Sequence, residues 1–172
     1  VIKKLLLHEM RVEDGPQNIA FLGFSEMGSL ILVSPAVRRI KERYPNANIY
    51  CWIFKENAEI VRLLGAAGEE DIIFMRTKNV PLLLWDVLRN ILAIRAHKID
   101  TVIDTELFSR FSAILSYLSG ANRRVGFHRS SLEGLYRGSL HTHNLAYNPY
   151  THISNNFLSL VESLTGPADI PL

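Results

Sequence analysis

The sequence is poor in the features that would place it in a special class of protein. Cys51 is the single cysteine among 172 residues, so no disulfide can form within the chain and a reducing compartment is expected. No apolar run approaches the roughly 20 residues that a membrane-spanning helix needs. The net charge is only +2, which disfavours nucleic acid as a partner. What remains is the composition of an ordinary globular domain, 48% hydrophobic and 21% charged.

Short apolar runs alternate along the chain with longer segments of helical spacing. The expected strands are Asn18–Phe24, Asn48–Phe54, Asp71–Met75, Asp100–Asp104, Arg124–Phe127 and His141–Leu145. The expected helices are Ser29–Tyr44, Asn57–Leu64, Pro81–His97, Ser109–Ser119 and Thr151–Leu164. This alternation predicts an α/β fold, a Rossmann-like parallel sheet with helices on both faces. Ligands of such sheets bind at the carboxyl ends of the strands.

The sequence divides into three expected parts. Residues 1–17 form an N-terminal packing segment, residues 18–166 form the Rossmann-like domain, and residues 167–172 begin a linker to a further domain. The segment Val1–Val12 mixes leucines with basic residues, as an amphipathic helix does. Two interpretations of this segment remain open, a helix packed on the domain and a helix lying on a membrane surface.

The loop at residues 23–29 joins the first strand to the first helix and is the most informative segment. The free N–H groups and dipole of a following helix favour an anion or a sugar there. Glu26 is the one carboxylate of the loop, and Ser25 and Ser29 add hydroxyls, which suits proton-transfer chemistry. Gly28 is followed by serine rather than lysine, which argues against a nucleotide triphosphatase. The loop also lacks the G-x-G-x-x-G pattern, which disfavours NAD or FAD.

Two further groups of polar residues were considered as sites. Asp104 and Glu106 follow the fourth strand and project the same way in an extended chain. They either bind sugar hydroxyls together, or Asp104 caps the next helix or accepts hydrogen bonds from loop N–H groups. His141 and His143 have the spacing of a metal-ligand pair, but no second cluster supports them, and we expect no metal.

Four stretches resemble the N-terminal domain of glycosyltransferase family 9, the lipopolysaccharide heptosyltransferases. They are residues 24–37, 100–113, 118–127 and 152–158, in the order that the family has them. The resemblance implies the N-terminal, acceptor-binding half of a two-domain GT-B glycosyltransferase. It implies metal-independent transfer of a heptose from a nucleotide sugar, ADP-heptose, held mainly by a C-terminal domain, with no other cofactor. The acceptor would be the lipid-linked core oligosaccharide, and the enzyme would lie peripherally on the cytoplasmic face of the inner membrane.

One departure from the family concerns the catalytic base. The family's proposed base is an aspartate directly after the loop glycine, and here that position is Ser29. We therefore hypothesise that Glu26 is the base, and that the N–H groups of Gly28 and Ser29 orient the substrates. Acidic groups of the acceptor would contact basic side chains at four positions, namely Arg110, Arg124, His128 and Arg129.

Two other functions remain open. A non-catalytic carbohydrate- or partner-binding domain would keep the fold without the chemistry, and Ser29 in place of aspartate favours it. A Rossmann-like enzyme that uses a nucleotide alone is disfavoured by the missing phosphate-binding lysine and G-x-G-x-x-G pattern. If the family resemblance holds, we expect the isolated chain to fold but to transfer no sugar.

Overall fold

The chain forms a six-stranded parallel sheet in the computed structural model, which describes residues 15–130, 137 and 139–165. The strand order is β3-β2-β1-β4-β5-β6, and every neighbouring pair is parallel. The strands are β1 Asn18–Gly23, β2 Asn48–Phe54, β3 Ile72–Met75, β4 Thr101–Asp104, β5 Arg123–Ser130 and β6 His143–Tyr147. The sequence pattern predicted all six, and the Rossmann-like fold class is confirmed. The predictions for residues 1–12 and 167–172 lie outside the described residues.

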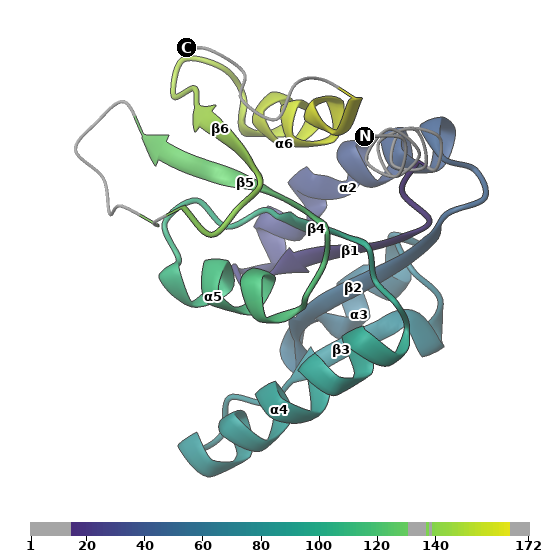
Figure 1. The fold of residues 1–172 in the computed structure, drawn as a ribbon, viewed down its shortest axis with the longest axis vertical. Coiled ribbons are helices and arrows are strands. Elements are labelled where there is room, and N and C mark those ends of the chain that lie inside the picture. Colours follow the sequence, from purple (N-terminus) through teal and green to yellow (C-terminus); the bar gives the residue numbers. More distant parts are fainter. Residues whose placement is uncertain (1–14, 131–136, 138, 166–172) are drawn as a thin grey trace, which may run out of the picture.

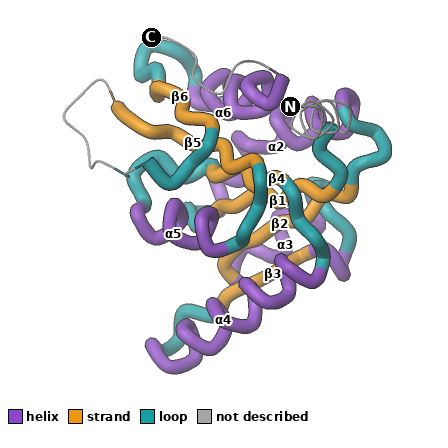
Figure 2. The backbone as a smooth tube through the Cα atoms, viewed as in Figure 1, coloured by secondary structure: helices purple, strands orange, loops and turns teal. Residues whose placement is uncertain are grey.

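Helices cover both faces of the sheet, as Figure 1 and Figure 2 show. One face carries α2 and α6, which pack together, and α3, and the other face carries α4 and α5. The helices are α2 Met27–Arg43, α3 Ala58–Leu63, α4 Val80–Ala96, α5 Arg110–Leu118 and α6 Ile153–Glu162. Short 3-10 turns complete the list, η1 Lys55–Asn57, η2 Glu69–Asp71 and η3 Ser163–Thr165. None of the helices within the described ranges is long and apolar enough to cross a membrane.

The direction of the connections reverses next to the central strand. From β1 the chain runs outward through β2 to β3, then returns across the sheet to β4 on the other side of β1. The loops after β1 and β4 therefore leave adjacent strands toward opposite faces, which opens a crevice at this edge. Both loops that the sequence analysis singled out, after Gly23 and after Asp104, meet at this point.

The interior contains the single cysteine, as its apolar neighbours in the sequence predict. Cys51 lies in β2 and is 4% exposed. Burial raises the pKa of its thiol to about 12, so the reactive thiolate is not populated at neutral pH. Cys51 is therefore a small core residue rather than a nucleophile.

Helix α4 is attached to edge strand β3 by polar groups rather than by apolar packing alone. Asp86 is fully buried, and it accepts hydrogen bonds from the Arg76 backbone N–H at 2.9 Å and from Arg76 Nε at 2.8 Å. One turn later, Asn90 Nδ2 donates to the Phe74 carbonyl oxygen at 3.0 Å. These bonds fix the rotation of α4 about its own axis.

Stability should depend on pH through Asp86. Hydrogen bonds from Arg76 lower the pKa of Asp86 from 3.8 to about 2, so the stabilisation is complete above about pH 4 and is lost as pH falls through the folded value. We expect Asp86→Asn to lower the free energy of unfolding by about 2 kcal/mol at neutral pH, and by progressively less below about pH 4. Urea unfolding at several pH values measures this, with the exposed Glu59→Gln as the control. A loss that stays constant down to about pH 2 would contradict the ion pair.

Candidate functional site at the carboxyl ends of β1 and β4

Glu106 holds the loop after β1 in place. Its Oε1 atom accepts hydrogen bonds from the backbone N–H groups of Phe24 at 2.6 Å and Ser25 at 2.7 Å, and Ser25 Oγ lies 2.8 Å away. From the other side, Asn57 Nδ2 donates to the Ser25 carbonyl oxygen at 2.8 Å. The loop is thus tied to residues that follow both neighbouring strands, β4 and β2. A site on this loop is preorganised by the scaffold.

Glu26 follows this fixed loop and precedes the first turn of α2. Its side chain is exposed, it makes no capping hydrogen bond, and its backbone oxygen accepts from the Ser29 N–H at 2.9 Å. The carboxylate is therefore open to a ligand. Of the three carboxylates proposed from the sequence as site residues, Glu26 is exposed, whereas Asp104 and Glu106 are buried.

The two glycines of the loop, Gly23 and Gly28, differ in the space that surrounds them. A Cβ atom at Gly23 would lie 2.9 Å from Leu30 Cδ2 and 3.3 Å from Thr105 Oγ1, so α2 packs against a bare backbone there. A Cβ atom at Gly28 would meet nothing within 4 Å, and the residue is exposed. Packing within the described chain therefore does not require glycine at position 28, and the bare backbone there is open to close approach by a ligand.

A buried ionic cluster lies directly below this loop. Asp104 is inaccessible to solvent, and Oδ2 forms an ion pair with the Arg137 guanidinium, lies 3.1 Å from His141 Nε2 and accepts from Ser112 Oγ at 2.9 Å. Its Oδ1 atom accepts from the Glu106 backbone N–H at 3.0 Å. Asp104 thus fixes the start of the segment from which Glu106 reaches the first loop.

Arg137 and His141 are the residues of this region that sequence reasoning missed. Arg137 is 3% exposed and also donates to the carbonyl oxygens of Ser109, Glu106 and Phe127, at 3.0, 2.5 and 3.1 Å. His141 was considered only as a metal ligand, yet its ring lies against Gly126, where a Cβ atom would come within 2.6 Å of Nε2. Neither residue is near Asp104 in sequence, so no spacing pointed to them.

The contacts bear on the two interpretations of the carboxylate pair. Asp104 accepts from a loop N–H group, as the second interpretation proposed, but the N-cap of α5 is Ser109, whose Oγ accepts from the Ser112 N–H at 3.1 Å. Direct contact of Asp104 or Glu106 with a sugar stays a prediction. Their burial counts against it, because both carboxylates are already bonded to protein donors.

The four basic residues predicted to contact the acceptor are not gathered at one place. Arg110 is exposed at the start of α5, at the site edge. His128 lies in β5 beyond Gly126, which pairs with Asp104, and so it is about 10 Å from β1, two strand spacings away. Arg129 follows it in β5, and its side chain lies outside the described part of the chain.

Arg124 lies near the opposite edge of the sheet, at the start of β5. Its guanidinium donates to the carbonyl oxygens of Leu140 at 2.9 Å and Ala121 at 2.6 Å, and it stacks over Tyr117. These contacts give Arg124 a role in holding the fold. A role in binding the acceptor stays a prediction, and the position counts against it.

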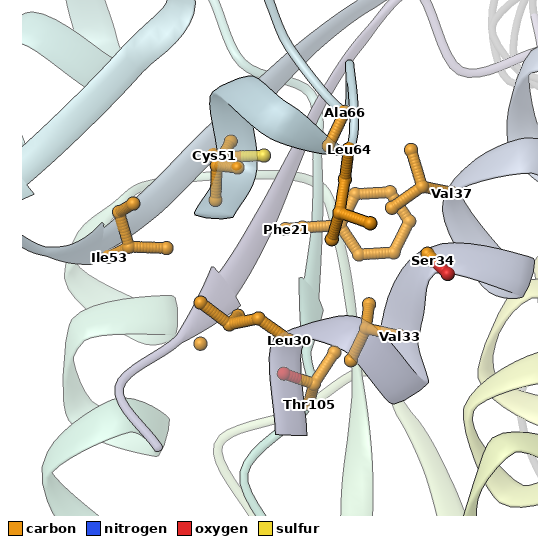
Figure 3. A pocket seen from close by; sticks show the side chains of 12 residues that line it. Phe21, Leu30, Val33, Ser34, Val37, Cys51, Ile53, Leu64, Ala66 and Thr105 are labelled. Carbon is orange, nitrogen blue, oxygen red and sulfur yellow. The ribbon is translucent and has the colours of Figure 1, made fainter. Parts of the chain in front are cut away.

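A small cavity lies behind the loop, between α2 and the sheet. Figure 3 shows its lining, with Phe21 at the centre and Leu30 and Thr105 on the loop side. It holds about 20 Å³ of free space, and nearly all of its lining is carbon. Ligand pockets are typically several hundred Å³, so this cavity is a packing defect and not a sugar site. The candidate site is the open surface around Glu26.

Comparison with solved structures shows which known proteins share this fold. No protein-family model matches the chain, and no curated protein matches it by sequence. Among solved structures, the chain is similar to Escherichia coli heptosyltransferase WaaC with ADP, with a TM-score of 0.68, 16% identity, and 87% of this chain and 48% of that chain covered. The chain is also similar to E. coli ADP-heptose lps heptosyltransferase II, with a TM-score of 0.67 and 16% identity, and the match covers 84% of this chain and 40% of that chain. A glycosyl transferase family 9 structure from Veillonella parvula has a TM-score of 0.68 and 15% identity to the chain, and the match covers 88% of this chain and 42% of that chain.

The fold is therefore that of the heptosyltransferases and family 9 glycosyltransferases, as the sequence resemblance predicted. The chain spans less than half the length of each of these three proteins. At 15–16% identity the likeness establishes the fold, while substrate and activity rest on the residues of the site.

Proposed function

We propose that this chain is the acceptor-binding domain of a glycosyltransferase that transfers heptose, or a related sugar, from a nucleotide sugar to the lipid-linked core of lipopolysaccharide. The observation that carries the proposal is the exposed carboxylate of Glu26 on a rigid loop at the crevice between β1 and β4. Two neighbours of known structure support a nucleotide-sugar donor, because they are heptosyltransferase WaaC with ADP and with ADP-2-deoxy-2-fluoro heptose.

The geometry suits removal of a proton from an acceptor hydroxyl. In the proposed reaction Glu26 accepts that proton while the hydroxyl oxygen bonds to the anomeric carbon of the donor sugar, and the bond from that carbon to the nucleotide diphosphate breaks. The N–H groups of Met27 and Gly28, at the exposed start of α2, would orient an oxygen of either substrate. The Ser29 N–H, which the sequence analysis assigned to this role with that of Gly28, donates instead to the Glu26 carbonyl oxygen at 2.9 Å. The lipid-linked acceptor implies a site of action at the cytoplasmic face of the inner membrane.

The test is an assay of transfer by the full-length protein from ADP-heptose to a core oligosaccharide acceptor, with the product identified by mass spectrometry. We expect transfer by the full-length protein and none by residues 1–172 alone, because a half site lacks the positioning that supplies much of the rate. Saturable transfer by the 172-residue chain would overturn the two-domain part of the proposal. Saturable binding of the oligosaccharide without turnover by the full-length protein would establish the alternative, a non-catalytic carbohydrate-binding domain, which Ser29 in place of aspartate favours.

Gly28→Ala separates ligand approach from folding. The added methyl group meets no atom of the described chain, and alanine favours a helix, so the free energy of unfolding should stay equal or rise by about 0.5 kcal/mol. Apparent substrate affinity should fall by about tenfold, because the methyl group occupies the approach to the helix N-terminus. Urea unfolding and saturation kinetics measure the two effects, with Glu42→Ala at the far end of α2 as the control. Unchanged affinity would place the substrates elsewhere.

A further inference from the structure

Helix α4 presents an apolar surface to solvent. Leu84, Leu88 and Leu92 recur at every fourth position and are 63%, 54% and 60% exposed, and Trp85 beside them is 62% exposed. We call these four residues the α4 stripe. The sequence holds two tryptophans, of which Trp52 is fully buried, so Trp85 is the exposed one. Leucines at helical spacing ordinarily face the core, and here they face outward.

The helix cannot turn the stripe inward without losing its polar anchors. Asp86 and Asn90 occupy the face toward β3, where they bind Arg76 and the Phe74 carbonyl oxygen. Rotating the leucines toward the sheet would break these bonds and leave the Asp86 carboxylate without its partners. The outward orientation is thus fixed by the most strongly bonded groups of the helix.

The side chains around the α4 stripe are mostly basic, although Arg76 and Arg89 pair with the Asp86 carboxylate. Five basic side chains lie on α4 or next to its ends, namely Arg76, Lys78, Arg89, Arg95 and Lys98. Over the described residues 72–130, the acidic residues are Asp86, Asp100, Asp104 and Glu106. Three of them are buried, and Asp100 is bonded to the backbone N–H groups of Gln17 and Asn18, at 2.8 and 3.0 Å. The acidic residues Glu42, Glu59 and Glu162 lie on helices of the other face. The exposed Glu56 lies beside the loop before α4, where it accepts a hydrogen bond from Thr77 Oγ1 at 3.4 Å.

We propose that the α4 stripe docks on an anionic lipid bilayer, with Leu84, Trp85, Leu88 and Leu92 inserted at the boundary between headgroups and acyl chains. The combination of exposed Trp and Leu with flanking Arg and Lys matches an interfacial helix. A second copy of the same surface would bring Lys78, Arg95 and Lys98 mainly against further cations, with few exposed acids beside them, whereas anionic headgroups supply the opposite charge.

Docking there would bring the candidate site to the bilayer surface. The first turns of α4 project past the sheet on the side where β1 ends (Figure 1), and Glu26 comes shortly after β1 in the chain. This inference deepens the proposed function and rests on it for its purpose, because a lipid-linked acceptor presents its sugars at that surface. It adds α4 to residues 1–12 as a segment proposed for membrane contact.

The test is co-sedimentation of the chain with phosphatidylcholine vesicles, with and without phosphatidylglycerol, together with the emission of Trp85. We expect binding only to vesicles that contain phosphatidylglycerol, weakened by salt and accompanied by a blue shift of the emission. Leu88→Ser should weaken binding by about tenfold or more, since it removes the transfer of a leucine side chain into an apolar environment. Arg89→Glu should weaken it as well. The matched control is Leu63→Ser on α3, which is 81% exposed on the other face and should change nothing.

Several results would overturn the proposal. They are equal binding by Leu88→Ser and the unchanged chain, absence of binding to either vesicle, and loss of binding on deletion of residues 1–14 but not with Leu88→Ser. Self-association that Leu88→Ser abolishes, measured by analytical ultracentrifugation without vesicles, would assign the stripe to a second copy instead. Transfer by the full-length protein to an acceptor without its lipid separates the two proposals. Vesicle binding without transfer would contradict the function alone, and transfer without vesicle binding would contradict the docking alone.

Discussion

Replacing Glu26 by glutamine in the full-length protein is expected to lower kcat by about 10²–10⁴, the usual contribution of a general base. Glutamine keeps the size of the side chain and removes its ability to accept a proton. The KM for the donor should hardly change, because the carboxylate acts on the acceptor hydroxyl. Stability should not change either, because the side chain is exposed and caps no helix.

The matched control is Glu56→Gln, an exposed carboxylate in η1 at the same edge of the sheet but outside the loop. Steady-state kinetics of the two variants, measured together, separates a base from a general effect of charge. A Glu26→Gln enzyme that kept most of its kcat would exclude this residue as the base. The loop hydroxyls of Ser25 and Ser29 would then be the next groups to examine.

Replacing Asp104 by alanine is expected to lower the free energy of unfolding by about 3–5 kcal/mol, because the change leaves a buried charge without its partner. The Arg137 guanidinium is 1% exposed and its counter-ion is Asp104. The His141 ring, also buried, loses a neighbour at 3.1 Å in the same step. Denaturant unfolding followed by circular dichroism measures the loss.

Asp104→Asn serves as the milder variant if the alanine variant does not fold, since it keeps the shape and removes only the charge. We expect its loss to be smaller than that of alanine but still more than 1 kcal/mol, the size of a charged hydrogen bond. The control is again Glu56→Gln, which should unfold at the midpoint of the unchanged chain. An Asp104→Ala variant with that same midpoint would show that the cluster does not stabilise the fold.

Periodicity along the sequence was sufficient to predict the sheet and the helices. Buried parallel strands are apolar throughout, and the predicted strand Asn48–Phe54 matches β2 at both ends. The sequence pattern of α4 predicted a helix, but it could not show that Asp86 and Asn90 face the sheet, because their partners Arg76 and Phe74 are in a different element. Leucine spacing alone would have placed the stripe inside.

The candidate site was predictable only where local chemistry defines it. The loop with Glu26 and Gly28 could be found because a strand, a short polar loop and a helix follow one another directly. The partners of Asp104 could not be found, since Arg137 and His141 are 33 and 37 residues away and pair with it only once β5 and β6 are in place. The strand order fixes such contacts, and no single segment encodes it.

The contact between Gly126 and His141 couples the effects of substitutions at these two positions on the stability of the protein. Any side chain at position 126 would begin inside the volume of the imidazole, 2.6 Å from Nε2, so a change there first requires a smaller residue at 141. That smaller residue would remove a neighbour of Asp104 and be unfavourable by itself. The loss of stability from changing both positions should therefore be smaller than the sum of the two single losses.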